Sequence, residues 1–320
     1  MAPIRRISPS FARKLIVACL VAVFAAPAAA QSSFSGIVVF GTSLSDPGNA
    51  FALNGEAGTP HDFAMNPLLI PTAPYAKGGH HFSNGATWIE QYARMVGLAS
   101  SVRPALTDGT ATNFAVGGAR AYDDGINFNL TRQVATFLER SGGVAPPQAL
   151  YVIEMGSNDI RDAFQIYATG GNGGPIMGQA IGSIASNVQR LYLAGARNFL
   201  VWTAPNIALT PAIRSLPPAA QGLMGVLTQS FNANLTGVLA QLSAGLPGVS
   251  FTRLDAYQLL DAIVADSAAY GLASVATPCL TPNDAPFSCQ HPDDYLFWDG
   301  IHPTKAAHAL LAQLAASVLP

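Results

Sequence analysis

The sequence of 320 residues has few charges and few cysteines. Only 11% of its residues are Asp, Glu, Lys or Arg, and it contains three cysteines. It has no internal repeat and no low-complexity linker, so we expect one large domain. The two cysteines that lie beyond residue 30 lack the close spacing of zinc ligands, so we expect no metal site.

Residues 1–30 have the three parts of an export signal. An apolar stretch at residues 15–26 follows a basic head, and small residues ending at Ala30 give the pattern expected before cleavage. The apolar stretch is too short to span a membrane comfortably. The basic residues are Arg5, Arg6, Arg13 and Lys14. We therefore expect a signal peptide at 1–30, a domain at 31–320, and a periplasmic or secreted location.

The expected mature chain is mildly acidic. Four of the 16 basic residues and none of the 18 acidic ones lie in residues 1–30, which leaves 12 against 18 and a net charge of −6 with His neutral. Nucleic-acid binding depends on neutralising phosphates, so this balance argues against a nucleic-acid partner. About 290 residues remain, enough for a substantial core.

Cys279 and Cys289 are the cysteines of the mature chain. In an exported protein such a pair is expected to form a disulfide, the alternative being two free thiols. Closing the short loop between them would stabilise the fold by roughly 2–3 kcal/mol.

Apolar runs that read as buried strands alternate with segments of helical periodicity. This alternation predicts a mainly parallel sheet covered by helices on both faces, a three-layer α/β/α domain. The expected strands are residues 36–40, 149–154, 199–203 and 249–254, and the expected helices are residues 87–96, 131–138, 176–194, 219–242 and 304–318. Residues 54–85 and 279–295 are expected to be long irregular loops that shape access to a site.

A Gly-x-Ser turn follows the first expected strand, in the sequence Phe40-Gly41-Thr42-Ser43-Leu44. It places a hydroxyl at the carboxyl end of a sheet, where open α/β folds carry their chemistry. Taken alone, it could equally be an ordinary strand-to-helix turn.

Three later segments supply the other groups that acyl transfer needs. They are a glycine-rich turn at residues 113–119, a Gly-Ser-Asn-Asp sequence at 156–159, and Asp-Gly-Ile-His-Pro-Thr at 299–304. Together with Ser43 they provide a hydroxyl, backbone amides, a side-chain amide, an imidazole and a carboxylate.

These four blocks, in order from Phe40 to Thr304, resemble the GDSL-type members of the SGNH hydrolase superfamily. The resemblance implies a flavodoxin-like α/β/α fold. It also implies that Ser43 is the nucleophile, that His302 is its base and that Asp299 orients His302. A carboxylate three residues before a His can reach the ring nitrogen that faces away from the serine.

The resemblance further implies an oxyanion hole. Its donors would be the backbone amide of Ser43, the backbone amide of Gly118 and the side-chain amide of Asn158, with Gly117 as the alternative glycine. One residue departs from the family motif: Thr42 stands where the family has Asp, which removes a negative charge beside the nucleophile.

Other polar residues receive structural roles. Asp46 and Asp159 are expected to brace loops, and His308 to be a surface or packing residue of the last helix rather than a base. His61, His80 and His81 lie in a polar loop and are expected to be exposed. His291 lacks the Asp-x-x-His arrangement.

These features predict an exported serine hydrolase of the esterase or lipase type. We expect it to act without a cofactor as a monomer, on a small-molecule or lipid ester, with at most transient contact with a lipid surface. The alternatives are an acyltransferase, a carbohydrate O-acetyl esterase and a lipid- or sugar-binding protein without turnover. For the carbohydrate reading, a sugar groove would be lined by Tyr75, His80, His81 and Trp88.

Overall fold

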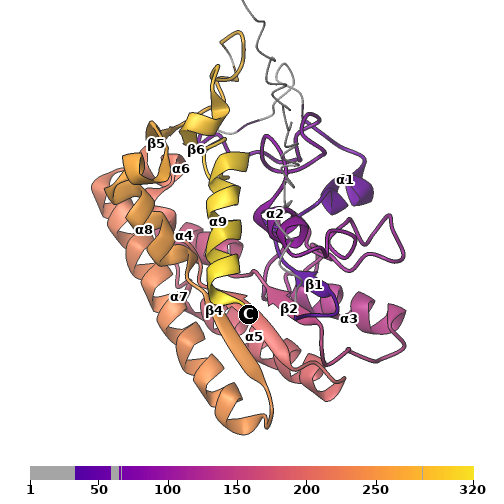
Figure 1. Ribbon diagram of the computed structural model, residues 1–320. Coiled ribbons are helices and arrows are strands. Elements are labelled where there is room, and N and C mark those ends of the chain that lie inside the picture. Colours follow the sequence, from indigo (N-terminus) through magenta and orange to yellow (C-terminus); the bar gives the residue numbers. More distant parts are fainter. Residues whose placement is uncertain (1–32, 59–64, 66, 283) are drawn as a thin grey trace, which may run out of the picture.

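The computed structural model describes residues 33–58, 65, 67–282 and 284–320 (Figure 1). The expected export signal, its cleavage site and His61 lie outside these residues.

The central sheet has four parallel strands in the order β1-β2-β3-β4. These are β1 (Ile37–Phe40), β2 (Leu150–Ile153), β3 (Asn198–Trp202) and β4 (Ser250–Leu254). Each lies at one of the four expected runs. β1 and β2 are buried along their whole length and are continuously apolar, whereas β4, at the edge of the sheet, is partly exposed and contains Ser250, Thr252 and Arg253. Parallel pairing brings their carboxyl ends to one edge of the sheet.

An irregular segment, residues 112–116, extends the sheet beyond β1. The N–H of Val39 donates to the carbonyl of Thr112 (2.9 Å), and the N–H of Phe114 donates to the carbonyl of Val39 (2.8 Å). The chain therefore passes from β1 to a neighbour on one side and then to β2 on the other. Such a reversal opens a crevice at the carboxyl ends of the strands, where α/β folds bind ligands.

Helices cover both faces of the sheet, which confirms the predicted three-layer α/β/α domain. One face packs on α3, α4, α5 and α7, and the opposite face on α2, α8 and α9. The bounds are α1 (Asn49–Asn54), α2 (Trp88–Met95), α3 (Leu130–Arg140), α4 (Ser157–Ala168), α5 (Gly174–Leu193), α6 (Pro211–Arg214), α7 (Pro218–Gly245), α8 (Ala256–Ala265) and α9 (Lys305–Val318). The five expected helices correspond to α2, α3, α5, α7 and α9, whereas the sequence did not indicate α4, α8 or the short helices α1 and α6.

Local capping explains where several of these helices begin. Thr87 and Glu90 form a capping box at the start of α2, where the Thr87 N–H donates to the Glu90 carboxylate (2.8 Å). The side chain of Asp255 accepts the Gln258 N–H at the start of α8, and Thr304 accepts the Ala307 N–H at the start of α9. Among the described residues, no helix is both long and apolar enough to cross a membrane.

A second, two-stranded sheet of β5 (Ser274–Pro278) and β6 (Tyr295–Phe297) lies beside α8 and α9. The predicted disulfide between Cys279 and Cys289 is confirmed, with their Cα atoms 4.9 Å apart. The N–H of Cys279 donates to the carbonyl of Phe297 (3.0 Å). The disulfide closes the loop, and this backbone hydrogen bond joins the loop to β6, the strand that precedes Asp299.

Candidate active site

Ser43, His302 and Asp299 form a hydrogen-bonded row at the carboxyl edge of the sheet. Ser43 lies in the turn after β1, while the other two residues precede α9. The Nε2 atom of His302 lies 2.9 Å from the Ser43 Oγ, and its Nδ1 atom lies 2.7 Å from the Asp299 Oδ2. The structure therefore brings together the three residues to which the motif assigned nucleophile, base and orienting acid.

The Asp299 carboxylate is completely buried and held by four donors. Its Oδ1 accepts the backbone N–H groups of Ile301 and His302, both at 2.8 Å. Its Oδ2 accepts the Tyr75 hydroxyl at 2.6 Å and faces the His302 Nδ1. We assign the proton of the neutral imidazole to Nδ1, because a buried carboxylate favours a donor there. The unprotonated Nε2 is then free to accept the proton of Ser43.

Tyr75 is a site residue whose role the sequence did not indicate. It lies 224 positions before Asp299, in a loop rich in proline and glycine. Burial, with the nearby charge of Asp299, raises its pKa well above the ordinary value. The hydroxyl therefore stays protonated and donates to Asp299 throughout the neutral range.

Gly300 allows this loop to approach the Asp299–His302 segment. Its N–H donates to the carbonyl of Leu69 (2.8 Å). A Cβ atom at this position would lie 1.9 Å from the carbonyl oxygen of Leu68. Glycine between Asp299 and His302 is therefore a steric requirement, and the predicted loop at residues 54–85 does pack against the site.

Asn158 lies at the start of α4, directly after β2, with its amide fixed at both ends. One Nδ2 hydrogen is donated to the carbonyl of Ala119 (2.8 Å), and Oδ1 accepts from the Arg161 guanidinium (3.2 Å). Asn158 and Ser43 line the same cavities. The second Nδ2 hydrogen remains for an oxyanion.

The two candidate glycines differ in what their N–H groups do. The Gly117 N–H donates to the Asp46 carboxylate (2.7 Å), and a Cβ atom there would lie 2.1 Å from the Phe82 ring. Gly118, at φ 81°, lines the cavity that contains Ser43, and its N–H has no acceptor among the described residues. The geometry therefore favours Gly118 as the backbone donor.

Asp46 and Asp159 brace the loops around the site, as the sequence predicts. Asp46 accepts the N–H groups of Gly48 (2.8 Å) and Asn49 (2.6 Å) besides that of Gly117, and Asp159 accepts those of Ala121 and Tyr122. Burial raises the pKa of both carboxyl groups to about 6, although these hydrogen bonds oppose it.

The expected exposure of His81 is wrong. Its side chain is buried, and its Nε2 lies 2.8 Å from the carboxylate of Glu90. Burial lowers its pKa, but the hydrogen bond to Glu90 and the charge of that carboxylate more than offset this, so the net shift is upward. The ion pair explains why a histidine from a polar loop can be buried.

The other histidines lie away from the hydrogen-bonded row. His308 is buried and accepts the Trp88 N–H at 3.2 Å, and burial lowers its pKa to about 3, so it packs in the neutral form. His80 stacks on Phe51, with ring centroids 3.7 Å apart, and His291 is exposed.

Three of the four residues expected to line a sugar groove do not face solvent. The side chains of Tyr75, His81 and Trp88 are buried in contacts within the protein. Trp88, for example, donates its indole N–H to the Ser45 hydroxyl (3.0 Å).

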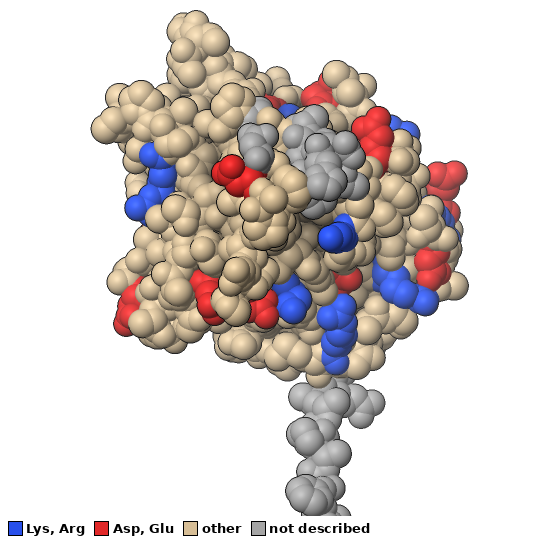
Figure 2. All heavy atoms as spheres, turned by 90° about the horizontal axis from the view of Figure 1, so that it is seen from above, with Lys and Arg blue, Asp and Glu red and all other residues tan. Residues whose placement is uncertain are grey.

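A polar cavity of about 350 Å³ opens over the row. Ser43, Asn158 and His302 lie in its wall with two arginines, Arg120 and Arg161. Arg120 is paired with the carboxylate of Asp162 (2.8 Å), whereas no carboxylate lies within 4.0 Å of Arg161 in the described part of the chain. On the face shown in Figure 2, basic side chains are scattered among acidic and uncharged ones.

The sequence is similar to those of known esterases and lipases. A model of the GDSL-like lipase/acylhydrolase family matches residues 37–315. Esterase EstA of Pseudomonas aeruginosa is 31% identical over 96% of this chain and 50% of its own length. The chain thus spans about half the length of the Pseudomonas relatives that it matches. A GDSL esterase/lipase of Arabidopsis thaliana is 27% identical over 88% of this chain and 86% of its own length.

Among solved structures, the extracellular lipase of Streptomyces rimosus aligns with 88% of this chain and 99% of its own, at 15% identity and a TM-score of 0.39. The family match spans all the segments that contribute Ser43, Gly118, Asn158, Asp299 and His302. The chain therefore belongs to the GDSL-like lipase/acylhydrolase family.

Proposed function

We propose that the protein is an exported serine hydrolase that cleaves carboxylic esters through an acyl-enzyme on Ser43. The observation that carries this proposal is the row Ser43–His302–Asp299 with unused N–H donors beside it in one cavity. Family membership supports the same class of reaction.

The proposed reaction begins when the Ser43 Oγ attacks the ester carbonyl and His302 Nε2 takes the hydroxyl proton. Asp299 holds the imidazolium that forms. The N–H groups of Ser43 and Gly118, with the Asn158 amide, stabilise the negative oxygen, and each such donor is typically worth about 3–4 kcal/mol. His302 then gives its proton to the departing alcohol. Water attacks the acyl-enzyme by the same route in reverse and releases the acid.

An acyltransferase would use the same residues, with a second alcohol replacing water. No contact in the described residues favours an alcohol acceptor. Three of the four side chains expected to line a sugar groove are buried, which argues against a carbohydrate esterase. We therefore propose simple ester hydrolysis.

The direct test measures hydrolysis of p-nitrophenyl esters from acetate to palmitate by the wild type and Ser43→Ala. We expect kcat to fall by about 10⁴-fold or more in the variant, as when other serine hydrolases lose their nucleophile. An organophosphonate should label Ser43 in the wild type alone. Equal rates in the two proteins would refute the proposal. Export is tested separately by sequencing the amino terminus of the secreted protein, which should begin near Gln31.

A further inference from the structure

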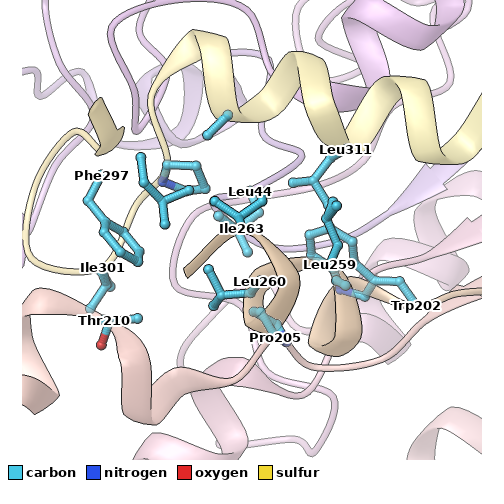
Figure 3. Close-up of a pocket in the computed structure, with 14 residues that line it drawn as sticks. Leu44, Trp202, Pro205, Thr210, Leu259, Leu260, Ile263, Phe297, Ile301 and Leu311 are labelled. Carbon is cyan, nitrogen blue, oxygen red and sulfur yellow. The ribbon is translucent and has the colours of Figure 1, made fainter. Parts of the chain in front are cut away.

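An apolar cavity lies behind the nucleophile turn, between α8, α9 and β6 (Figure 3). Its volume is about 60 Å³. Thirteen of its 14 lining residues are Leu, Ile, Ala, Pro, Phe or Trp. The exception, Thr210, already donates its hydroxyl to the carbonyl of Ile207 (2.8 Å). The cavity therefore offers an apolar ligand a wall without unpaired hydroxyl groups.

This cavity adjoins the site described above. A smaller space of about 40 Å³ contains Ser43, Asn158 and His302 in its wall. The small space and the apolar cavity share four lining residues, Leu44, Pro205, Thr210 and Ile301. Leu44 directly follows Ser43, and Ile301 directly precedes His302. The wall that the two spaces share therefore includes the chain neighbours of the nucleophile and the base.

A second cavity, lined by Ser43 itself, has the opposite character. This is the polar cavity of about 350 Å³, with Arg120 and Arg161 in its wall, and Arg161 also lines the small space. An ester has one apolar tail on its acyl carbon and a second group on its alcohol oxygen. The two cavities differ in polarity in the same way. Ser43 lines the polar cavity, and its neighbour Leu44 lines the apolar one.

We propose that the apolar cavity binds the acyl chain of the ester, while the alcohol portion lies in the polar cavity beside Arg161. This inference rests on the proposed function and names its substrate class as esters of short to medium-length acids. A single water molecule needs roughly 10–15 Å³ of cavity volume. The volume of about 60 Å³ then suits a tail of only a few carbons.

Three buried residues determine the depth of the cavity. Ile263 and Leu260 project from α8 toward Leu44 in Figure 3. Ala307, on α9, contributes a wall residue that is 3% exposed and has the smallest chiral side chain. Shortening Ile263 therefore deepens the cavity, and enlarging Ala307 fills it.

The test compares kcat/KM for p-nitrophenyl acetate, butanoate, hexanoate, octanoate, dodecanoate and palmitate in four proteins. They are the wild type, Ile263→Ala, Ala307→Leu and the control Ile184→Ala. Ile184 is 1% exposed and packs in α5 on the opposite face of the sheet, so its truncation removes the same atoms from a core site away from the cavity.

In the wild type, kcat/KM should rise about fourfold for each methylene group that enters the cavity. It should then fall by at least tenfold between its maximum and palmitate. Ile263→Ala should move the maximum to longer chains, and Ala307→Leu should move it toward acetate. Ile184→Ala should keep the wild-type order of substrates even where its stability is lower.

Two other outcomes are informative in different ways. In the first, hydrolysis depends on Ser43, but both cavity variants keep the chain-length profile of Ile184→Ala or the wild type prefers palmitate. Either result would show that the acyl chain does not bind in this cavity, and the proposed hydrolase function would still hold. If no ester is hydrolysed in a Ser43-dependent way, both the proposed function and the assignment of the acyl chain to this cavity are wrong. Ile263→Ala enlarges the cavity without crowding, so it keeps the test decisive where Ala307→Leu does not fold.

Discussion

Thr42 donates both its backbone N–H and its hydroxyl to the buried carboxyl group of Glu154, at distances of 2.8 and 2.9 Å. Thr42 occupies the position where the family motif has Asp. Glu154 directly follows β2, so in this chain a carboxyl group reaches the nucleophile turn from the neighbouring strand. The turn that carries Ser43 therefore lacks the Asp of the family motif, but it contacts the carboxyl group of Glu154 instead.

Replacing Thr42 by the motif residue should be harmful in this chain. Thr42→Asp would place a second carboxyl group against Glu154 in a fully buried site, where an uncompensated charge costs about 3 kcal/mol or more. We expect urea unfolding at pH 7 to show a loss of that order, with lower kcat. The double variant Thr42→Asp/Glu154→Thr, which exchanges the two groups, should recover much of both. A single variant as stable as the wild type would contradict this account.

Glu154 should also make stability fall as pH rises. Burial raises its pKa to about 8, although hydrogen bonds from Thr42 oppose the shift. The same group ionises near 4.5 when unperturbed. Between these values the folded state holds a proton that the unfolded state has released, so the free energy of unfolding decreases from about pH 4.5 to about pH 8.

Glu154→Gln removes this titration and keeps the size of the side chain. From pH 5 to pH 8 the free energy of unfolding should fall less in the variant, by on the order of 2–4 kcal/mol. Asp46 and Asp159, whose pKa values are also raised, titrate in both proteins, and their effect cancels in the difference. Urea titrations at four pH values measure it, and parallel curves for the two proteins would show that Glu154 does not titrate in this range.

The sequence predicted those parts of the fold and site that depend on short segments. Three of the strands are nearly continuous apolar runs, whereas β4 mixes polar and apolar residues. Asn158 begins α4, and Ser43, Asp299 and His302 lie in loops whose spacing already limits what their side chains can reach. The helix α8 could have been found as well, because Asp255 caps an apolar helical pattern. The helix α4 was hidden because residues 156–159 were interpreted only as a loop motif.

The missed features depend on contacts between distant segments. Tyr75 reaches Asp299 across the fold, and no periodicity marks it within a loop of prolines and glycines. His81 looked like an exposed loop residue because burial of its ring depends on Glu90, a partner in α2. The role of Glu154 was likewise hidden, since it ends an apolar strand and its partner Thr42 is 112 positions away.

Removing the Tyr75 hydroxyl tests whether this missed residue supports the hydrogen-bonded row. In Tyr75→Phe, Asp299 loses one donor and keeps the N–H groups of Ile301 and His302. A hydrogen bond to a charged group is worth about 1.5–3 kcal/mol, which sets an upper limit of roughly 10–100-fold on the loss of kcat/KM. We expect a loss of about tenfold, measured on the best p-nitrophenyl ester, with little change in KM.

Tyr92→Phe is the matched control for this variant. Tyr92 is 1% exposed in α2 and packs in the core on the face covered by α2 and α9. It should lose no more than a small factor in kcat/KM. If the two variants lose activity equally, the hydroxyl of Tyr75 contributes only to packing and not to the placement of Asp299.

Asn158 gives the sharpest test of the oxyanion site, because its contacts separate catalysis from folding. Asn158→Ala removes the free amide hydrogen and should lower kcat by about 10²–10³-fold with KM nearly unchanged, since an oxyanion forms only in the transition state. Arg161→Leu keeps the amide but removes the group that holds its oxygen at 3.2 Å. It should lower kcat by a smaller factor, about tenfold.

Melting temperatures of both variants report any loss of the fold. A properly folded Asn158→Ala variant with near wild-type kcat would mean that the backbone amides of Ser43 and Gly118 suffice, and that Asn158 serves to brace the turn at Ala119.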